Sequence, residues 1–255
     1  PQVLAFFWVI KVLSTTMGET VADWFDAQFN LGLPANTAIF GALFLLFLEW
    51  QVLLKRYVAP VYWTTVILVS ITGTLSTDNL TDKLGIPLWQ STAAFSALLA
   101  VVFVLWWVRE RTLDIAAINT RARETFYWLA ILVTFSLGTA AGDLITEGFD
   151  DAHPGIGYRN GLILFTVLVV LCFAAYKLKA SGVLTFWIAY VLTRPLGACL
   201  GGYLTAPTKP NEDYAYPGLG IDRYLVNGVF LWVVVALVIY LGVTRRDCEP
   251  TESQL

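Results

Sequence analysis

Eight apolar segments, each close to the length of a membrane-crossing helix, dominate this sequence. A helix needs about 20 apolar residues to cross the hydrocarbon core of a bilayer. Turn signals such as LGLPAN (31–36) and DKLGIP (82–87) separate the segments. The segments span residues 3–26, 37–54, 60–80, 88–108, 125–147, 160–177, 183–205 and 224–243. The sequence therefore predicts an all-α, polytopic membrane protein with about eight transmembrane helices in a lipid bilayer.

The composition agrees with this prediction and excludes several other classes. Hydrophobic residues make up 57% of the 255 residues and charged residues only 14%, which leaves more apolar surface than a soluble domain could cover. The net charge of −3 gives no indication of nucleic-acid binding. Cys172, Cys199 and Cys248 are too far apart for a CxxC metal site. No nucleotide-binding loop, hydrolase triad or zincin motif is present, so we expect neither an enzyme nor a resident cofactor.

Lysine and arginine are concentrated in every second loop. They follow the second, fourth, sixth and eighth helices, at 55–56, 109–123, 177–179 and 245–246, while the other loops carry acids. Loops rich in Lys and Arg stay on the cytoplasmic side of a membrane. The pattern therefore predicts that both termini are cytoplasmic.

An internal repeat divides the chain into four copies. Each copy contains a tryptophan and, ten residues later, a glycine, and these align without gaps in WVIKVLSTTMGETVAD (8–23), WTTVILVSITGTLSTD (63–78), WLAILVTFSLGTAAGD (128–143) and WIAYVLTRPLGACLGG (187–202). An acid follows fifteen residues after the tryptophan as Asp23, Asp78 and Asp143, whereas the fourth copy has Gly202. We place the copies at approximately 1–56, 57–122, 123–180 and 181–246, followed by a polar tail at 247–255.

Each copy contains two helices, so all four copies have the same orientation and the repeats are parallel. The tryptophans Trp8, Trp63, Trp128 and Trp187 are then expected at one depth, in an aromatic belt near the cytoplasmic interface. We expect the glycine pairs Gly138/Gly142 and Gly197/Gly201 to allow close helix packing.

The ionisable residues of the odd-numbered helices fall on one helix face. Read in steps of four from the third residue after the tryptophan, the first copy gives Lys11, Thr15, Glu19 and Asp23, and residues four apart share a face. The even-numbered helices are almost entirely apolar. Because charged side chains avoid lipid and face a bundle interior or a water-filled cavity, the odd-numbered helices are predicted inside and the even-numbered helices around them.

This polar stripe predicts a site with an acidic outer part and a basic inner part. Its candidate residues for ligand binding or transport are Lys11, Thr15, Glu19, Asp23, Thr74, Asp78, Asn79, Thr139, Asp143 and Arg194. Asp26, Asp82 and Glu147 are interpreted as interfacial acids. Lys11 either pairs with Glu19, reaches the cytoplasmic surface, or contacts an anionic ligand.

Oxygen ligands without histidine or cysteine favour hard cations such as Mg²⁺, Ca²⁺, Mn²⁺, Na⁺ or protons. The predicted metal ligands are Glu19, Asp23, Asp78 and Asp143, with the divalent cation as substrate. The GETVAD (18–23), STDNLTD (76–82), LGTAAGDL (137–144) and TRPLGA (193–198) segments resemble a bacterial family of uncharacterised membrane-anchored proteins built from a repeated segment of unknown function. The resemblance implies a bacterial inner-membrane protein of this repeat architecture and no established activity.

Three functions remain open at this point. The first is a secondary transporter or exporter of a hard cation, coupled to protons. The second is a transporter of a small anionic or zwitterionic solute that uses Lys11 and Arg194. The third is a membrane module that binds a cofactor or lipid without transport. The sequence also leaves open whether copies of the chain form a homo-oligomer.

Overall fold

The computed structural model describes residues 5–29, 31–54, 57–115, 118, 120–150, 153–210 and 216–244. Several features that the sequence analysis uses lie outside the described residues: Lys55, Arg56, Arg245, Arg246, Cys248 and the tail at 247–255.

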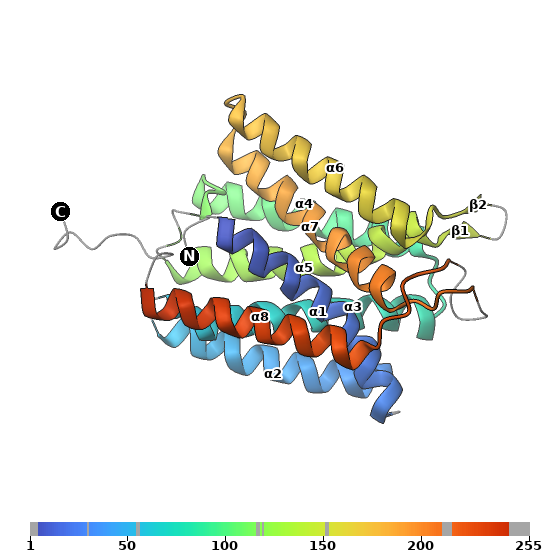
Figure 1. Ribbon diagram of the computed structural model, residues 1–255. Coiled ribbons are helices and arrows are strands. Elements are labelled where there is room, and N and C mark those ends of the chain that lie inside the picture. The colour runs from blue at the N-terminus through green and yellow to red at the C-terminus, as the bar shows by residue number, and fades with distance from the viewer. Residues whose placement is uncertain are drawn as a thin grey trace.

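Eight long helices make up the described chain (Figure 1). They are α1 (Ala5–Phe29), α2 (Leu33–Leu53), α3 (Ala59–Asp78), α4 (Leu88–Glu110), α5 (Arg121–Thr146), α6 (Gly157–Lys177), α7 (Gly182–Thr205) and α8 (Arg223–Thr244). A π-helical turn, η1 (Asn79–Lys83), continues α3, and a short hairpin of β1 (Gly148–Asp150) and β2 (His153–Pro154) follows α5. The predicted all-α class is confirmed.

The helix boundaries differ from the predicted ones by a few residues, most clearly around the first turn. α1 continues to Phe29, and α2 begins at Leu33 inside the expected LGLPAN turn. Pro34 explains the early start, because proline suits the first turn of a helix, where no backbone N–H is needed. Among the described helices, seven are long and apolar enough to cross a membrane. The eighth, α1, carries the polar stripe of the first repeat and is not among these seven. The chain is therefore a multi-pass membrane protein.

The odd-numbered helices form the interior of the bundle. In the most apolar stretch of each helix, 78% of α3 and 61% of α5 and α7 is buried, against 22% of α2, α4, α6 and α8. α1 contributes buried residues along much of its length and contacts both α3 and α7. The predicted division into inner and outer helices is thus confirmed by burial.

The four repeats close into a ring. The inner helices contact one another in the order α1, α3, α5, α7 and back to α1. Each outer helix packs on the inner helix of the following repeat: α2 on α3, α4 on α5, α6 on α7, and α8 on α1. Figure 1 shows that α1 begins and α8 ends at the same end of the bundle. The parallel repeats therefore form a pseudo-fourfold arrangement in which the last outer helix completes the circle.

The repeat glycines define the contacts of this ring. Each lies against the neighbouring inner helix, at the residue seven positions after that helix's tryptophan: Gly18 against Ser70, Gly73 against Phe135, Gly138 against Arg194, and Gly197 against Thr15. A methyl group added at Gly138 would lie 2.5 Å from Arg194 Cγ. Small residues let helix backbones approach closely, so the same contact repeated four times fixes the inner helices at short spacing.

The repeat tryptophans do not form the predicted interfacial belt. Trp63, Trp128 and Trp187 are buried, 1%, 3% and 5% exposed, and only Trp8 is partly exposed. Their rings pack between the inner helices, as where the Trp63 and Phe7 ring centroids lie 5.5 Å apart. Each tryptophan precedes the polar stripe by three residues, and residues three apart share a helix face. Turning the stripe inward therefore also turns the tryptophans inward.

Candidate functional site

A cavity of about 700 Å³ lies between the C-terminal halves of the four inner helices. We call it the vestibule. Among its lining residues are seven carboxylates: Glu19, Asp23, Asp26, Asp78, Asp82, Asp143 and Glu147. Apolar side chains such as Leu75 and Ala198, together with Tyr158 and Arg223, complete much of the wall. The stripe residues that lie farthest from the tryptophans thus face one shared space.

Three aspartates lie near helix ends, where the helix dipole disfavours a negative charge. Asp23, Asp78 and Asp143 lie in or near the last turns of α1, α3 and α5. The helix dipole is negative at this end and disfavours anions. Each side chain is half-buried on the vestibule wall, so three acidic groups share one enclosed space.

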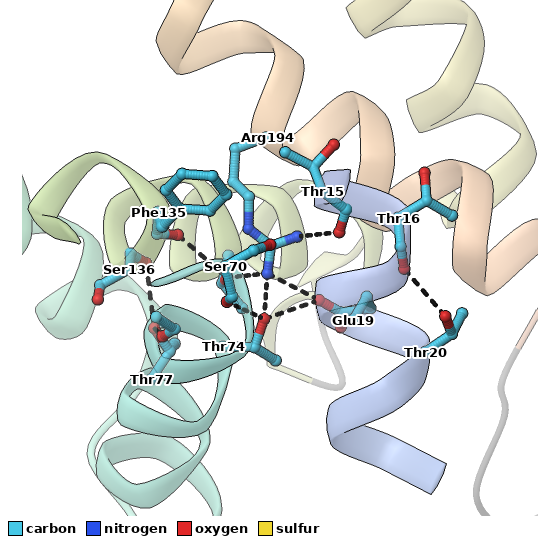
Figure 2. A network of polar contacts seen from close by, with 12 residues as sticks. Thr15, Thr16, Glu19, Thr20, Ser70, Thr74, Thr77, Phe135, Ser136 and Arg194 are labelled. Atoms are coloured by element: carbon cyan, nitrogen blue, oxygen red, sulfur yellow. Dashed lines mark hydrogen bonds and ion pairs between the residues drawn. The ribbon is translucent and has the colours of Figure 1, made fainter. Parts of the chain in front are cut away.

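Arg194 lies beside the vestibule, bound to Glu19 of its wall. Its side chain leaves α7 and points between α1, α3 and α5 (Figure 2). Nη2 donates to Glu19 Oε2 at 3.0 Å and to Thr139 Oγ1 at 2.8 Å, and it also contacts the hydroxyl of Thr74. Nη1 donates to the backbone oxygen of Thr15 at 3.2 Å. The arginine of the fourth repeat therefore bonds to all three other inner helices.

The partners of Arg194 occupy equivalent positions. Glu19, Thr74 and Thr139 each lie eleven residues after the tryptophan of their repeat, and the fourth repeat has Ala198 at that position. The pseudo-fourfold ring therefore contains one base facing one acid and two hydroxyls, a charge-neutral layer beneath the acidic vestibule.

The vestibule also affects a carboxylate at its mouth. The pKa of Glu147 is raised. The main cause is limited access to water in this concave site, and the second cause is the nearby Glu19 carboxylate. The Tyr158 hydroxyl donates to Glu147 Oε1 at 3.4 Å and opposes this change, because it stabilises the charged form. Glu147 is thus able to exchange a proton at a higher pH than an ordinary glutamate.

Lys11 lies on the far side of Arg194 from the vestibule. Its side chain is 0% exposed, and Nζ lies 4.0 Å from the centroid of the Phe135 ring and 4.1 Å from that of Tyr190. Nζ makes no hydrogen bond in the described part of the chain. The expected pairing with Glu19 is wrong, since Arg194 makes that contact. The expected reach to the surface is also wrong, because two aromatic faces enclose the ammonium group.

The structure brings together most of the predicted site residues but not all of them. Glu19, Asp23, Asp78 and Asp143 line the vestibule, and Thr74, Thr139 and Arg194 form a buried hydrogen-bonded cluster next to it. Asn79 is a structural tie instead, since its Nδ2 donates to Thr37 Oγ1 at 2.6 Å and to the Leu75 carbonyl at 2.7 Å. The hydroxyl of Thr15 likewise bonds to the backbone oxygens of Val12 and Thr193, so only its carbonyl oxygen takes part in the site.

Sequence reasoning missed several vestibule residues. Asp82 and Glu147 lie on the same stripe, one step of four after Asp78 and Asp143, so the spacing contained a signal that the interfacial interpretation set aside. Asp26 lines the cavity while accepting a hydrogen bond from Asn36 at 2.7 Å. Tyr158 and Arg223 come from the first turns of the outer helices α6 and α8, where the repeat gave no signal.

The carboxylates surround the vestibule without converging on a point. In the described residues, no group of three or more His, Cys, Asp or Glu side chains is arranged to hold a metal ion. A preformed metal centre made of Glu19, Asp23, Asp78 and Asp143 is therefore not supported. The arrangement instead offers a cavity lined by separated acidic groups.

Comparison with known proteins gives one match. The model of a family described as Repeat of Unknown Function (DUF347) matches residues 6–57, 61–112, 126–180 and 185–247, which agree with the four repeats. No curated protein matches the chain, and no solved structure matches it.

Proposed function

The chain belongs to this DUF347 repeat family, whose description names no activity, and from its geometry we propose that it is a secondary membrane transporter of a cation. The observation that carries the proposal is the convergence of Glu19, Asp23, Asp78 and Asp143 from three repeats on one vestibule. Carboxylates placed inside a membrane are costly and normally mark an ion or substrate pathway.

The balance of charge supports a cation over an anion. Seven carboxylates line the vestibule, against Arg223 on its wall and Arg194 beside it. Arg194 is already paired with Glu19. Lys11, which an anionic or zwitterionic solute would need, is enclosed by Phe135 and Tyr190 outside the vestibule. A cation entering the vestibule therefore meets favourable charge throughout, whereas an anion does not.

The described contacts also support alternating access over an open pore. Below Arg194, the axis is filled by Phe135 and Lys11 and then by buried aromatic rings, including the hydroxyl pair of Tyr62 and Tyr127 at 2.5 Å. This layer is the barrier to a hydrated ion in our proposal. We take the observed conformation to be the one that binds the cation, with the vestibule open to one side of the membrane. Protons exchange on the vestibule carboxylates during transport.

We place the protein in the bacterial inner membrane with both termini in the cytoplasm, on the basis of the Lys and Arg distribution and the family resemblance. The vestibule lies at the end of the inner helices opposite the start of α1. In this orientation it opens to the outside of the cell, where it would release an exported cation or receive an imported one.

Flux measurements with purified protein in liposomes test the proposal. We expect accumulation of at least one cation from a panel of Na⁺, Mg²⁺, Ca²⁺, Mn²⁺ and organic amines when a pH gradient is imposed. Asp78→Asn and Asp143→Asn should lower the rate at least tenfold, because each removes a vestibule charge. Glu49→Gln is the matched control, since Glu49 is exposed on the outer helix α2. Equal flux in protein-containing and empty liposomes for every cation would overturn the proposal.

A further inference from the structure

We propose that the transported cation is an organic molecule with two or more alkylammonium or guanidinium groups, such as a diamine or polyamine. This inference rests on the proposed function and names its substrate class. It places one charged group of the substrate at Glu19, on the wall of the vestibule, and a second group among the aspartates above.

The first argument is that the site already holds such a group. The guanidinium of Arg194 is a tethered organic cation, and its Nη2 contacts a carboxylate and two hydroxyls from three different helices. This is a set of acceptors that recognises N–H donors. Of these acceptors Glu19 also lines the vestibule, so a substrate amine or guanidinium there meets the same carboxylate.

The second argument is that the fit to Arg194 is incomplete. A guanidinium has five N–H donors. Arg194 is 0% exposed, yet its Nε has no hydrogen-bond partner among the described residues. Three acceptors share Nη2 while this buried donor remains unsatisfied. An unsatisfied buried donor is unfavourable, so the guanidinium does not fully match the acceptors around it.

The third argument is that the vestibule suits a directly coordinated metal ion less well than an organic cation. Hard divalent cations need six or more oxygens at short range. No three acidic, histidine or cysteine side chains in the described chain are arranged for this. Separated carboxylates suit a ligand whose positive charges are themselves separated by a chain of methylene groups.

The fourth argument concerns length and lining. Successive acids on the stripe are four residues apart, from Glu19 to Asp23 and from Asp143 to Glu147, which is about 6 Å along a helix. Apolar side chains, including Ala22, Leu75 and Ala198, line the wall between them. The volume of about 700 Å³ lies in the range of about 300–1,000 Å³ that is usual for small organic ligands. A flexible chain with a positive group at each end matches the spacing of the acids and the apolar lining.

Binding to the detergent-purified full chain, measured by isothermal titration calorimetry, tests this inference. The probes are 1,4-diaminobutane, spermidine and 4-aminobutylguanidine, with n-butylamine as a monocation of similar length, and Mn²⁺ and Mg²⁺ as metals. We expect the dications and polyamine to bind at least tenfold more tightly than n-butylamine. Asp143→Asn should weaken them at least tenfold, whereas Glu49→Gln should not.

The outcomes separate this inference from the proposed function. Binding of Mn²⁺ or Mg²⁺ without the amines would overturn the organic substrate and leave cation transport standing. Equal binding of n-butylamine and the diamines would overturn the requirement for a second charge. Absence of binding by every probe would overturn the organic substrate, and the liposome flux of Na⁺ and Ca²⁺ would then decide the proposed function. The wild-type protein alone decides between these outcomes, so a variant that fails to fold leaves the test intact.

Discussion

Arg194 Nη2 lies 3.0 Å from Glu19 Oε2, and this contact joins the fourth repeat to the first at the centre of the ring. The arginine occupies the position that Thr15, Ser70 and Phe135 hold in the other repeats. The fourth repeat also lacks the aspartate found in the other three, at Gly202. The fourth repeat thus lacks the acid at one position and carries a base at another, and that base pairs with Glu19 of the vestibule.

Glu19→Gln should destabilise the protein by about 3–5 kcal/mol, because removing one partner leaves the buried guanidinium without an anion. Thermal unfolding in detergent measures the change. The double variant Glu19→Gln with Arg194→Met should recover part of the loss, since no unpaired charge remains. A double variant less stable than Glu19→Gln alone would contradict this account of the pair.

Gly73→Ala should destabilise the ring by about 1–3 kcal/mol through overpacking. The added methyl group would lie 2.7 Å from Phe135 Cβ and 3.2 Å from the backbone nitrogen of Ser136, neither of which can move alone. Gly228→Ala on α8 is the matched control, because no atom lies within 4 Å of the added methyl there. Similar unfolding temperatures for the two variants would show that the glycine contacts do not set the helix spacing.

Lys11→Met should stabilise the protein by about 1–4 kcal/mol, as apolar residues of similar volume often do when they replace buried ionic groups. The ammonium is buried with aromatic faces and no hydrogen-bond acceptor in the described chain. Unfolding temperature and cation flux should be measured together. A stabilised variant with normal flux would make Lys11 dispensable for transport, while a loss of stability would show that the contacts with Phe135 and Tyr190 outweigh the cost of burial.

Glu147 should titrate at a higher pH than an ordinary glutamate, because its surroundings raise its pKa. Below this raised pKa the carboxyl group is neutral, so the vestibule loses one negative charge and cation binding weakens as the pH falls. Infrared difference spectra of wild type against Glu147→Gln measure the protonation directly. Tyr158→Phe should move the midpoint further upward, since the hydroxyl that donates to the carboxylate is lost; a downward move would contradict the assignment.

Much of the fold could be predicted because the signals are local and repeated. Apolar length gave the helices, and the step of four placed Glu19, Asp23, Asp78 and Asp143 on one inward face. The hydrogen-bond partners of Asn79 could not be predicted in the same way. Its amide lies between α2 and α3, and the partner Thr37 is 42 residues away in sequence.

The sequence by itself determined the number of helices, the four parallel repeats and the division into inner and outer helices, because these follow from hydrophobic length, periodicity and the cost of charge in lipid. Only the tertiary structure decided which residues meet. Each glycine touches the following inner helix, and each outer helix covers the next repeat. Arg194 therefore reaches Glu19 while Lys11 remains apart. Side-chain partners between helices depend on the order and rotation of those helices in the ring, and no spacing within one helix contains that information.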